Sequence, residues 1–349
     1  MFNDSYNGYL HTVPRGIAWI ASGLPFRWTP VVYALGSMVV TVACCALVLS
    51  RRVAWLLPRF HQRAAVFALL LLLPRAAELH ATLTNTIWWC GIALLLLILS
   101  DDPTSRVGVA LELVVVGVLV LSGANGILLA PFVAFRWWRT RSWASVAVVG
   151  VWWAAAAGQL WILSNSTRPD GGDLPPMADL GRWAVERVFG AIFISGRYVG
   201  DQAHLVEDWP LWVTAVCVVA ATLVAVVLVT GLRPSTWLLL GGVVAAGVAS
   251  GYVTVGASAR LLPERYTAIP LAALLIGLVA ARPRIQAVRW LQVGLWIWLG
   301  VARVFDVSIP AREPVPWDPV ADCVEAARDD CIARANPVPG QWATPVEAG

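Results

Sequence analysis

The chain contains no lysine, and all 25 of its basic residues are arginine. Charge of either sign is scarce: only 13% of the 349 residues are charged, whereas soluble domains carry about 25%. Hydrophobic residues make up 59%, and the mean hydropathy is +0.71. The composition therefore excludes a water-soluble globular protein and predicts an integral membrane protein.

Several short motifs are also missing. There is no glycine-rich phosphate loop, which argues against a soluble nucleotide site, and nothing in the sequence indicates nucleic-acid binding. The six cysteines show no spacing typical of zinc or haem sites. Cys44, Cys45, Cys90 and Cys217 lie in apolar runs, where we expect them to act as small hydrophobic side chains.

Apolar runs predict an all-α, polytopic transmembrane bundle of about ten spans, each needing roughly 20 residues. Several runs are shorter, notably 64–74 and 126–138, and we interpret them as broken helices lining a cavity or as spans with polar ends. The membrane domain would cover 1–305, followed by a polar tail at 306–349. The runs lie at 30–50, 64–74, 87–100, 107–121, 126–138, 143–163, 209–230, 236–256, 267–281 and 290–305.

Arginine is concentrated in the loops on one side of this alternating arrangement, and arginine-rich short loops remain in the cytoplasm. Residues 1–29, 75–86, 164–208, 257–266 and 306–349 are then external, so we expect the active face outside. All acidic residues except Asp101, Asp102 and Glu112 fall on this external side. The arginines assigned to the cytoplasm are Arg51, Arg52, Arg59, Arg63, Arg136, Arg139, Arg141, Arg233, Arg282, Arg284 and Arg289.

The external segment 164–208 also contains an apolar stripe. Between about 179 and 198, apolar residues recur near helical spacing, which predicts a helix lying in the interface plane as a wall for a lipid-linked ligand. The stripe consists of Leu180, Trp183, Ala184, Val188, Phe189, Ile192 and Phe193.

Four further segments are rich in polar and aromatic residues: NGYLHTVPR at 7–15, E…TNTIWW at 78–89, SG…LLAP at 122–131 and ERYTAIP at 264–270. In order and spacing they resemble an actinobacterial branch of the GT-C class of membrane glycosyltransferases. The resemblance implies transfer of a sugar from a polyprenyl-phosphate donor to a cell-envelope glycan or lipid acceptor, on the outer face of a bacterial plasma membrane. It also implies a helix upstream of residue 1, and Asn3 stands where many relatives have a second acid.

Transfer to a hydroxyl group needs a carboxylate base, and the departing phosphate needs cationic donors. Asp4 is the only acid of the first external loop, so we expect it to be the catalytic base. External arginines would hold the phosphate, while polar residues of 78–85 would position the acceptor or a divalent cation, magnesium or manganese. No cofactor is firmly implied. The expected substrate-binding residues are Tyr9, His11, Arg15, Arg75, Glu78, His80, Asn85, Arg260, Arg265 and Tyr266.

Alternatives remain open at this level. A polysaccharide or lipid transporter, or a flippase, would carry internal repeats or paired broken spans, and we find no convincing repeat. A non-catalytic assembly subunit would keep the fold without the site. Individual residues also have structural interpretations: Glu78 could pair with Arg75, Arg265 could snorkel, and the histidines could be hydrogen-bonded structural residues.

The tail holds the two remaining cysteines. Asp318 and Pro319 predict the start of a helix over 320–334. In one continuous helix Cys323 and Cys331 would lie about 12 Å apart, but a disulfide needs less than about 7 Å between Cα atoms. A bridge therefore requires the helix to break before Cys331, and in an oxidising exterior we expect that bridge.

Overall fold

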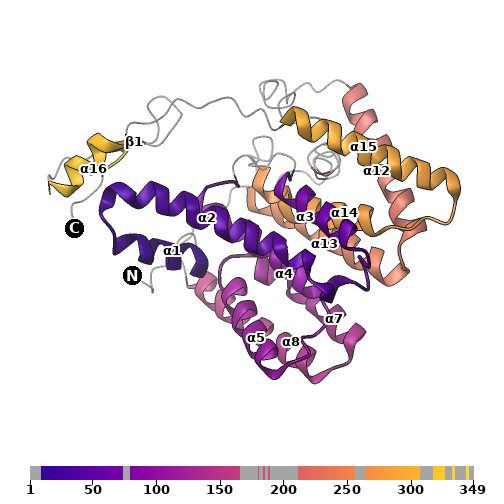
Figure 1. Ribbon diagram of the computed structural model, residues 1–349, viewed down its shortest axis with the longest axis horizontal. Helices are drawn as coiled ribbons and strands as arrows, with labels where there is room; N and C mark the ends of the chain where they lie inside the picture. Colours follow the sequence, from indigo (N-terminus) through magenta and orange to yellow (C-terminus); the bar gives the residue numbers. More distant parts are fainter. Residues whose placement is uncertain are drawn as a thin grey trace.

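The computed structural model describes residues 9–73, 79–165, 211–255, 264–306, 317–326, 332–334 and 343–345, together with Leu180, Ala184 and Val188. Over these residues the fold is a bundle of helices, as predicted, with one two-stranded sheet in the tail. In Figure 1, α2 follows the long axis, and α1 and α16 lie at the left end.

The elements alternate long helices with short 3-10 turns. The first half of the chain contains α1 (Thr12–Ser22), η1 (Phe26–Trp28), α2 (Thr29–Ala46), η2 (Leu47–Leu49), η3 (Arg51–Val53), α3 (Phe60–Leu71), η4 (Leu83–Asn85), α4 (Thr86–Ile98), α5 (Arg106–Val120), α6 (Asn125–Leu129), η5 (Ala130–Phe132), α7 (Val133–Thr140) and α8 (Trp143–Ser164). The second half contains α12 (Leu211–Gly231), α13 (Pro234–Val255), η9 (Glu264–Thr267), α14 (Ala268–Ala280), α15 (Gln286–Asp306), α16 (Asp318–Glu325), β1 (Ile332–Arg334) and β2 (Ala343–Pro345).

Every predicted apolar run contains helix, and the short run at 126–138 is indeed broken, into α6, η5 and α7. Within the described part of the chain, three segments are long and apolar enough to cross a membrane. They are Phe26–Leu49, Trp143–Ser164 and Pro234–Gly251. The remaining helices are shorter or more polar, so ten crossings stay a prediction.

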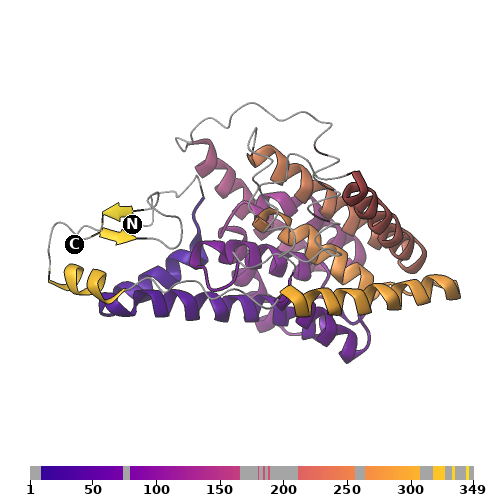
Figure 2. The ribbon, with the colours of Figure 1, turned by 90° about the horizontal axis from the view of Figure 1, so that it is seen from above.

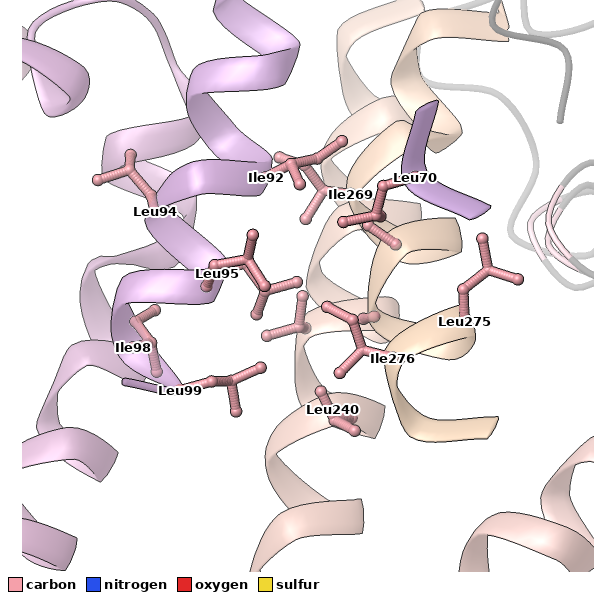
Figure 3. Close-up of a cluster of buried hydrophobic side chains, with 14 of the residues drawn as sticks. Leu70, Ile92, Leu94, Leu95, Ile98, Leu99, Leu240, Ile269, Leu275 and Ile276 are labelled. Carbon is pink, nitrogen blue, oxygen red and sulfur yellow. The ribbon is translucent and has the colours of Figure 1, made fainter. Parts of the chain in front are cut away.

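The core lies around two short helices, α4 and α14, of 13 residues each. Every residue of α14 is buried, and α4 is buried throughout except at Ile87 and Trp88. Figure 3 shows Ile92 of α4 pointing toward Ile269 of α14. A methyl group at Gly91 would lie only 2.6 Å from Ile269 Cδ1, so glycine is what allows these helices to approach.

The outer helices present apolar side chains to the surroundings. On α5, Val107, Leu111 and Val114 are 62–69% exposed, and on α8 Trp161 is 71% exposed. Similar rows of exposed residues lie on α2, α12 and α15. Soluble proteins rarely expose apolar surface on this scale, so these faces fit hydrocarbon and support a membrane protein.

Several loops meet at one end of the bundle, which we call the arginine end: 50–59, 100–106, 136–143, 231–234 and 281–289. The Asp101 N–H donates to the Arg52 carbonyl at 2.7 Å. The Arg282 N–H donates to the Gly231 carbonyl at 2.8 Å. The prediction that the arginine-rich loops share one side of the bundle is thus confirmed, while the identity of that side stays a prediction.

A buried ion network holds the arginine end together. The Arg136 side chain is completely buried, and its guanidinium donates to Glu112 at 2.8 and 2.9 Å and to Asp102 at 2.6 Å. Arg52 donates to the same Glu112 carboxylate at 2.6 Å. Ser145 adds a hydroxyl donor to Asp102 at 2.8 Å. The network connects η3, the turn after α4, α5, α7 and the start of α8.

The tail packs against the start of α2, at the end of the bundle where α1 also lies (Figure 2). Arg27 forms ion pairs with Glu325 at 2.7 Å and Asp322 at 3.3 Å. The Phe26 and Trp317 rings stack with centroids 5.1 Å apart. The first and last described segments of the chain therefore lie on the same side of the bundle.

The predicted tail helix over 320–334 is wrong in its length. It begins at Asp318, as expected, but α16 ends at Glu325, and β1 pairs antiparallel with β2 instead. Pairing with the next strand along the chain supplies β1 with backbone hydrogen bonds that the helical pattern did not predict. Cys323 is disulfide-bonded, but its expected partner Cys331 lies outside the described residues, so the pairing stays a prediction.

Replacing Glu112 by glutamine should destabilise the protein strongly, because the fully buried Arg136 loses half of its countercharge. Breaking a buried pair costs about 3–5 kcal/mol. Asp101→Asn is the matched control, since Asp101 pairs with Arg139 at the same end but is 46% exposed, and exposed pairs contribute about 1 kcal/mol or less. Unfolding by SDS in mixed micelles measures both, and equal losses would contradict this account of the network.

Candidate functional site

The end of the bundle opposite the arginine end is formed by residues 9–12, 79–89, 121–126 and 264–267, which we call the histidine end. Thr12 Oγ1 donates to the Leu121 carbonyl at 3.0 Å. Asn125 Nδ2 donates to the Ile87 carbonyl at 2.9 Å. The Trp88 and Tyr266 rings meet edge to face with centroids 5.0 Å apart. A continuous series of contacts thus joins four segments that are far apart in the sequence.

His11 precedes α1 in a left-handed conformation, with φ 53°, which is uncommon for residues other than glycine. Its side chain is buried, and its ring Nδ1 lies 3.0 Å from the Tyr9 carbonyl oxygen. Because a carbonyl only accepts, Nδ1 donates and the lone pair of the neutral ring is on Nε2. Burial lowers the pKa of His11 below 6.5, which outweighs the opposing effect of the Tyr9 hydrogen bond. His11 is therefore neutral at pH 7, with an imidazole acceptor at Nε2.

His80 is held in a different way. Its ring packs on Trp89 with centroids 5.4 Å apart, and Trp89 Nε1 donates to the Leu79 carbonyl at 3.1 Å. Burial also lowers the pKa of His80. These contacts agree with a structural role for His80, and Asn85 lies nearby, buried at the end of η4.

Arg265 and Tyr266 lie in η9, directly before the buried helix α14. The Arg265 guanidinium lies 5.6 Å from the centre of the Tyr266 ring. A cation over an aromatic face is attracted by the ring quadrupole. Tyr266 in turn packs against Trp88 of α4, so the ring beneath the guanidinium is itself held by a contact with another helix.

The structure thus brings part of the predicted site to one end of the bundle. The predicted residues found there are Tyr9, His11, Arg15, His80, Asn85, Arg265 and Tyr266. Asp4, Arg75, Glu78 and Arg260 lie outside the described residues. Of the predicted interfacial helix at 179–198, three stripe positions are described, Leu180, Ala184 and Val188, and all three pack against the core. That this segment lies in the interface plane stays a prediction.

Two buried polar residues of the histidine end were missed from the sequence. Gln159 is fully buried on α8; its amide nitrogen donates to the Leu121 carbonyl at 2.9 Å, and its oxygen accepts from the Leu10 N–H at 3.3 Å. Asn125 was inside a motif but had no role assigned. A lone glutamine within the long apolar run 143–163 was the available signal, because polar side chains inside spans need partners.

No group of three or more histidine, cysteine or acidic side chains suited to a metal ion occurs among the described residues. The chain matches no known protein family, no curated protein and no solved structure at a significant level.

Acidification should destabilise the protein through its buried histidines. The folded-state pKa of His11 lies below the unfolded value of about 6.5, so the native state binds fewer protons and stability is lost as pH falls through 6.5. We expect the Tm in detergent to fall between pH 7.5 and 5.5, and to fall less for His11→Gln. His61→Gln is the control, because His61 is exposed. If the Tm of His11→Gln fell as much as that of the wild type, His11 would not be a cause of the acid sensitivity.

Proposed function

We propose that the chain is a membrane glycosyltransferase of the GT-C type, which moves a sugar from a polyprenyl-phosphate donor to a cell-envelope acceptor. The observation that carries the proposal is the meeting of all four motif segments at the histidine end. Their contacts are the Thr12–Leu121 and Asn125–Ile87 hydrogen bonds and the Trp88–Tyr266 ring pair.

The proposal includes an orientation and a number of crossings. The arginine end faces the cytoplasm, because short arginine-rich loops are retained there. The chain then crosses the bacterial plasma membrane ten times, and the histidine end and the tail are external. The short helices α4 and α14 are compatible with crossing because protein rather than lipid surrounds them.

In the proposed reaction an acceptor hydroxyl oxygen attacks the anomeric carbon of the sugar. The hydroxyl proton passes to the Asp4 carboxylate, and the bond between the anomeric carbon and the phosphate oxygen breaks. The phosphate leaves with the bonding electron pair, and Arg265 binds it through two parallel N–H donors.

The other predicted residues have supporting roles. Arg75, Arg260 or Arg15 would add charge against the phosphate. Glu78, His80 and Asn85 would position the acceptor or a divalent cation, magnesium or manganese.

Asp4→Asn should reduce sugar transfer by about 100-fold or more, because general-base catalysis contributes about 10²–10⁴-fold. Transfer of a radiolabelled sugar from its polyprenyl phosphate, in membranes containing the full chain, measures this loss. Asp318→Asn is the control, because Asp318 is an exposed acid on the same predicted side. Full transfer by Asp4→Asn removes Asp4 as the base. A wild-type protein that carries the lipid-linked sugar across vesicles without transferring it is instead a flippase.

A further inference from the structure

A cavity of about 320 Å³ opens at the arginine end, between the turn before α3 and the turn that joins α14 to α15. Its polar lining consists of Arg59, Arg282, Arg289, Gln62 and Gln292. Two segments that are more than 200 residues apart thus contribute guanidinium groups to one space.

This cavity has no countercharge of its own. No carboxylate lines it, and among the described residues none of its three arginines forms an ion pair. The acids at the same end are already engaged by other arginines. These pairs are Asp101 with Arg139, Asp102 with Arg136, and Glu112 with Arg52 and Arg136.

The polar side chains of the cavity are held in place by the backbone. Arg289 Nε donates to the Pro283 carbonyl at 2.8 Å. The Gln292 amide donates to the Leu278 and Ala281 carbonyls at 2.7 and 2.9 Å. Such preorganisation lowers the entropy cost of binding a ligand.

Apolar surface lies directly beside the charged lining. Phe60, which follows Arg59, is 64% exposed, and Trp290, which follows Arg289, is 67% exposed. Farther along α15, Ile297 is 63% exposed. Aromatic residues next to arginines are typical of the boundary between hydrocarbon and headgroups. An occupant of this place is therefore anionic at one end and apolar at the other.

We propose that the cavity binds the phosphate headgroup of an anionic membrane lipid. Arg59, Arg282 and Arg289 donate to the phosphate oxygens, and the acyl chains lie along α15 beyond Trp290. Basic pockets between membrane helices bind such headgroups, and guanidinium groups suit phosphate because they donate two parallel hydrogen bonds. The site is separate from the histidine end and does not depend on the proposed transferase activity.

The test uses the full-length protein in a neutral detergent, with phosphatidylglycerol, phosphatidylcholine or inorganic phosphate added. Native mass spectrometry measures lipid retention and thermal shift measures stabilisation. We expect phosphatidylglycerol to be retained in preference to phosphatidylcholine, and Arg282→Gln to weaken that retention about tenfold, the loss of one charge-assisted contact. Arg284→Gln should change retention less than about twofold, because Arg284 is exposed on the same turn but does not line the cavity.

Three results would overturn the proposal. Equal weakening by Arg282→Gln and Arg284→Gln would indicate diffuse charge attraction rather than a site. Equal retention of phosphatidylcholine would remove the selectivity for an anionic headgroup. Full stabilisation by millimolar inorganic phosphate, with no further effect of phosphatidylglycerol, would assign the cavity to a soluble phosphate compound. An unchanged Tm of Arg282→Gln without lipid shows that the variant is folded.

Discussion

A guanidinium group without any contact with solvent must be neutralised by its neighbours. The Arg136 side chain at the arginine end is such a group, and the helices and turns around it must supply carboxylates. Its two carboxylates come from different places, Glu112 within α5 and Asp102 in the turn after α4. Satisfying both fixes the end of α7 against α5 and against the start of α8. The broken segment of α6, η5 and α7 is therefore anchored to its neighbours by the ion pairs of Arg136, although each of its helices is short.

The two ends of the bundle are stabilised by different chemistry. At the arginine end, buried acids neutralise some arginines, and three others surround a cavity without a carboxylate. At the histidine end, the contacts between segments are neutral, made by Gln159, Asn125 and Thr12 with backbone carbonyls. Between them lies the apolar layer around α4 and α14. The two ends of the bundle therefore differ in charge, as expected of a membrane protein whose two faces meet different surroundings.

The sequence predicted features that depend on local pattern. Apolar runs located the helices, and a broken helix was one of the two interpretations open for the short run at 126–138. It could not predict features that join distant segments. The Leu10–Gln159 hydrogen bond connects residues 149 positions apart. Strand β1 is a different kind of miss, because it pairs with the next strand where local propensity favoured a helix. Glu112 shows both sides of this limit, because its position inside the predicted run 107–121 was evident from the sequence while its arginine partners were not.

The candidate site was predictable to a similar degree. His11 and Tyr266 were identified from motifs and do lie at one end of the bundle. The supporting residues Gln159 and Asn125 were missed because their partners are backbone groups, which leave no trace in the sequence.

The central claim is that the arginine end and the histidine end face opposite sides of the membrane. Substituted-cysteine labelling tests it directly, because the four described cysteines in the helices are buried and Cys323 is disulfide-bonded. Ser22→Cys and Arg284→Cys place exposed thiols at opposite ends. With a membrane-impermeant maleimide, Ser22→Cys should be labelled in intact cells and Arg284→Cys only after permeabilisation. Labelling of Arg284→Cys in intact cells would contradict the account.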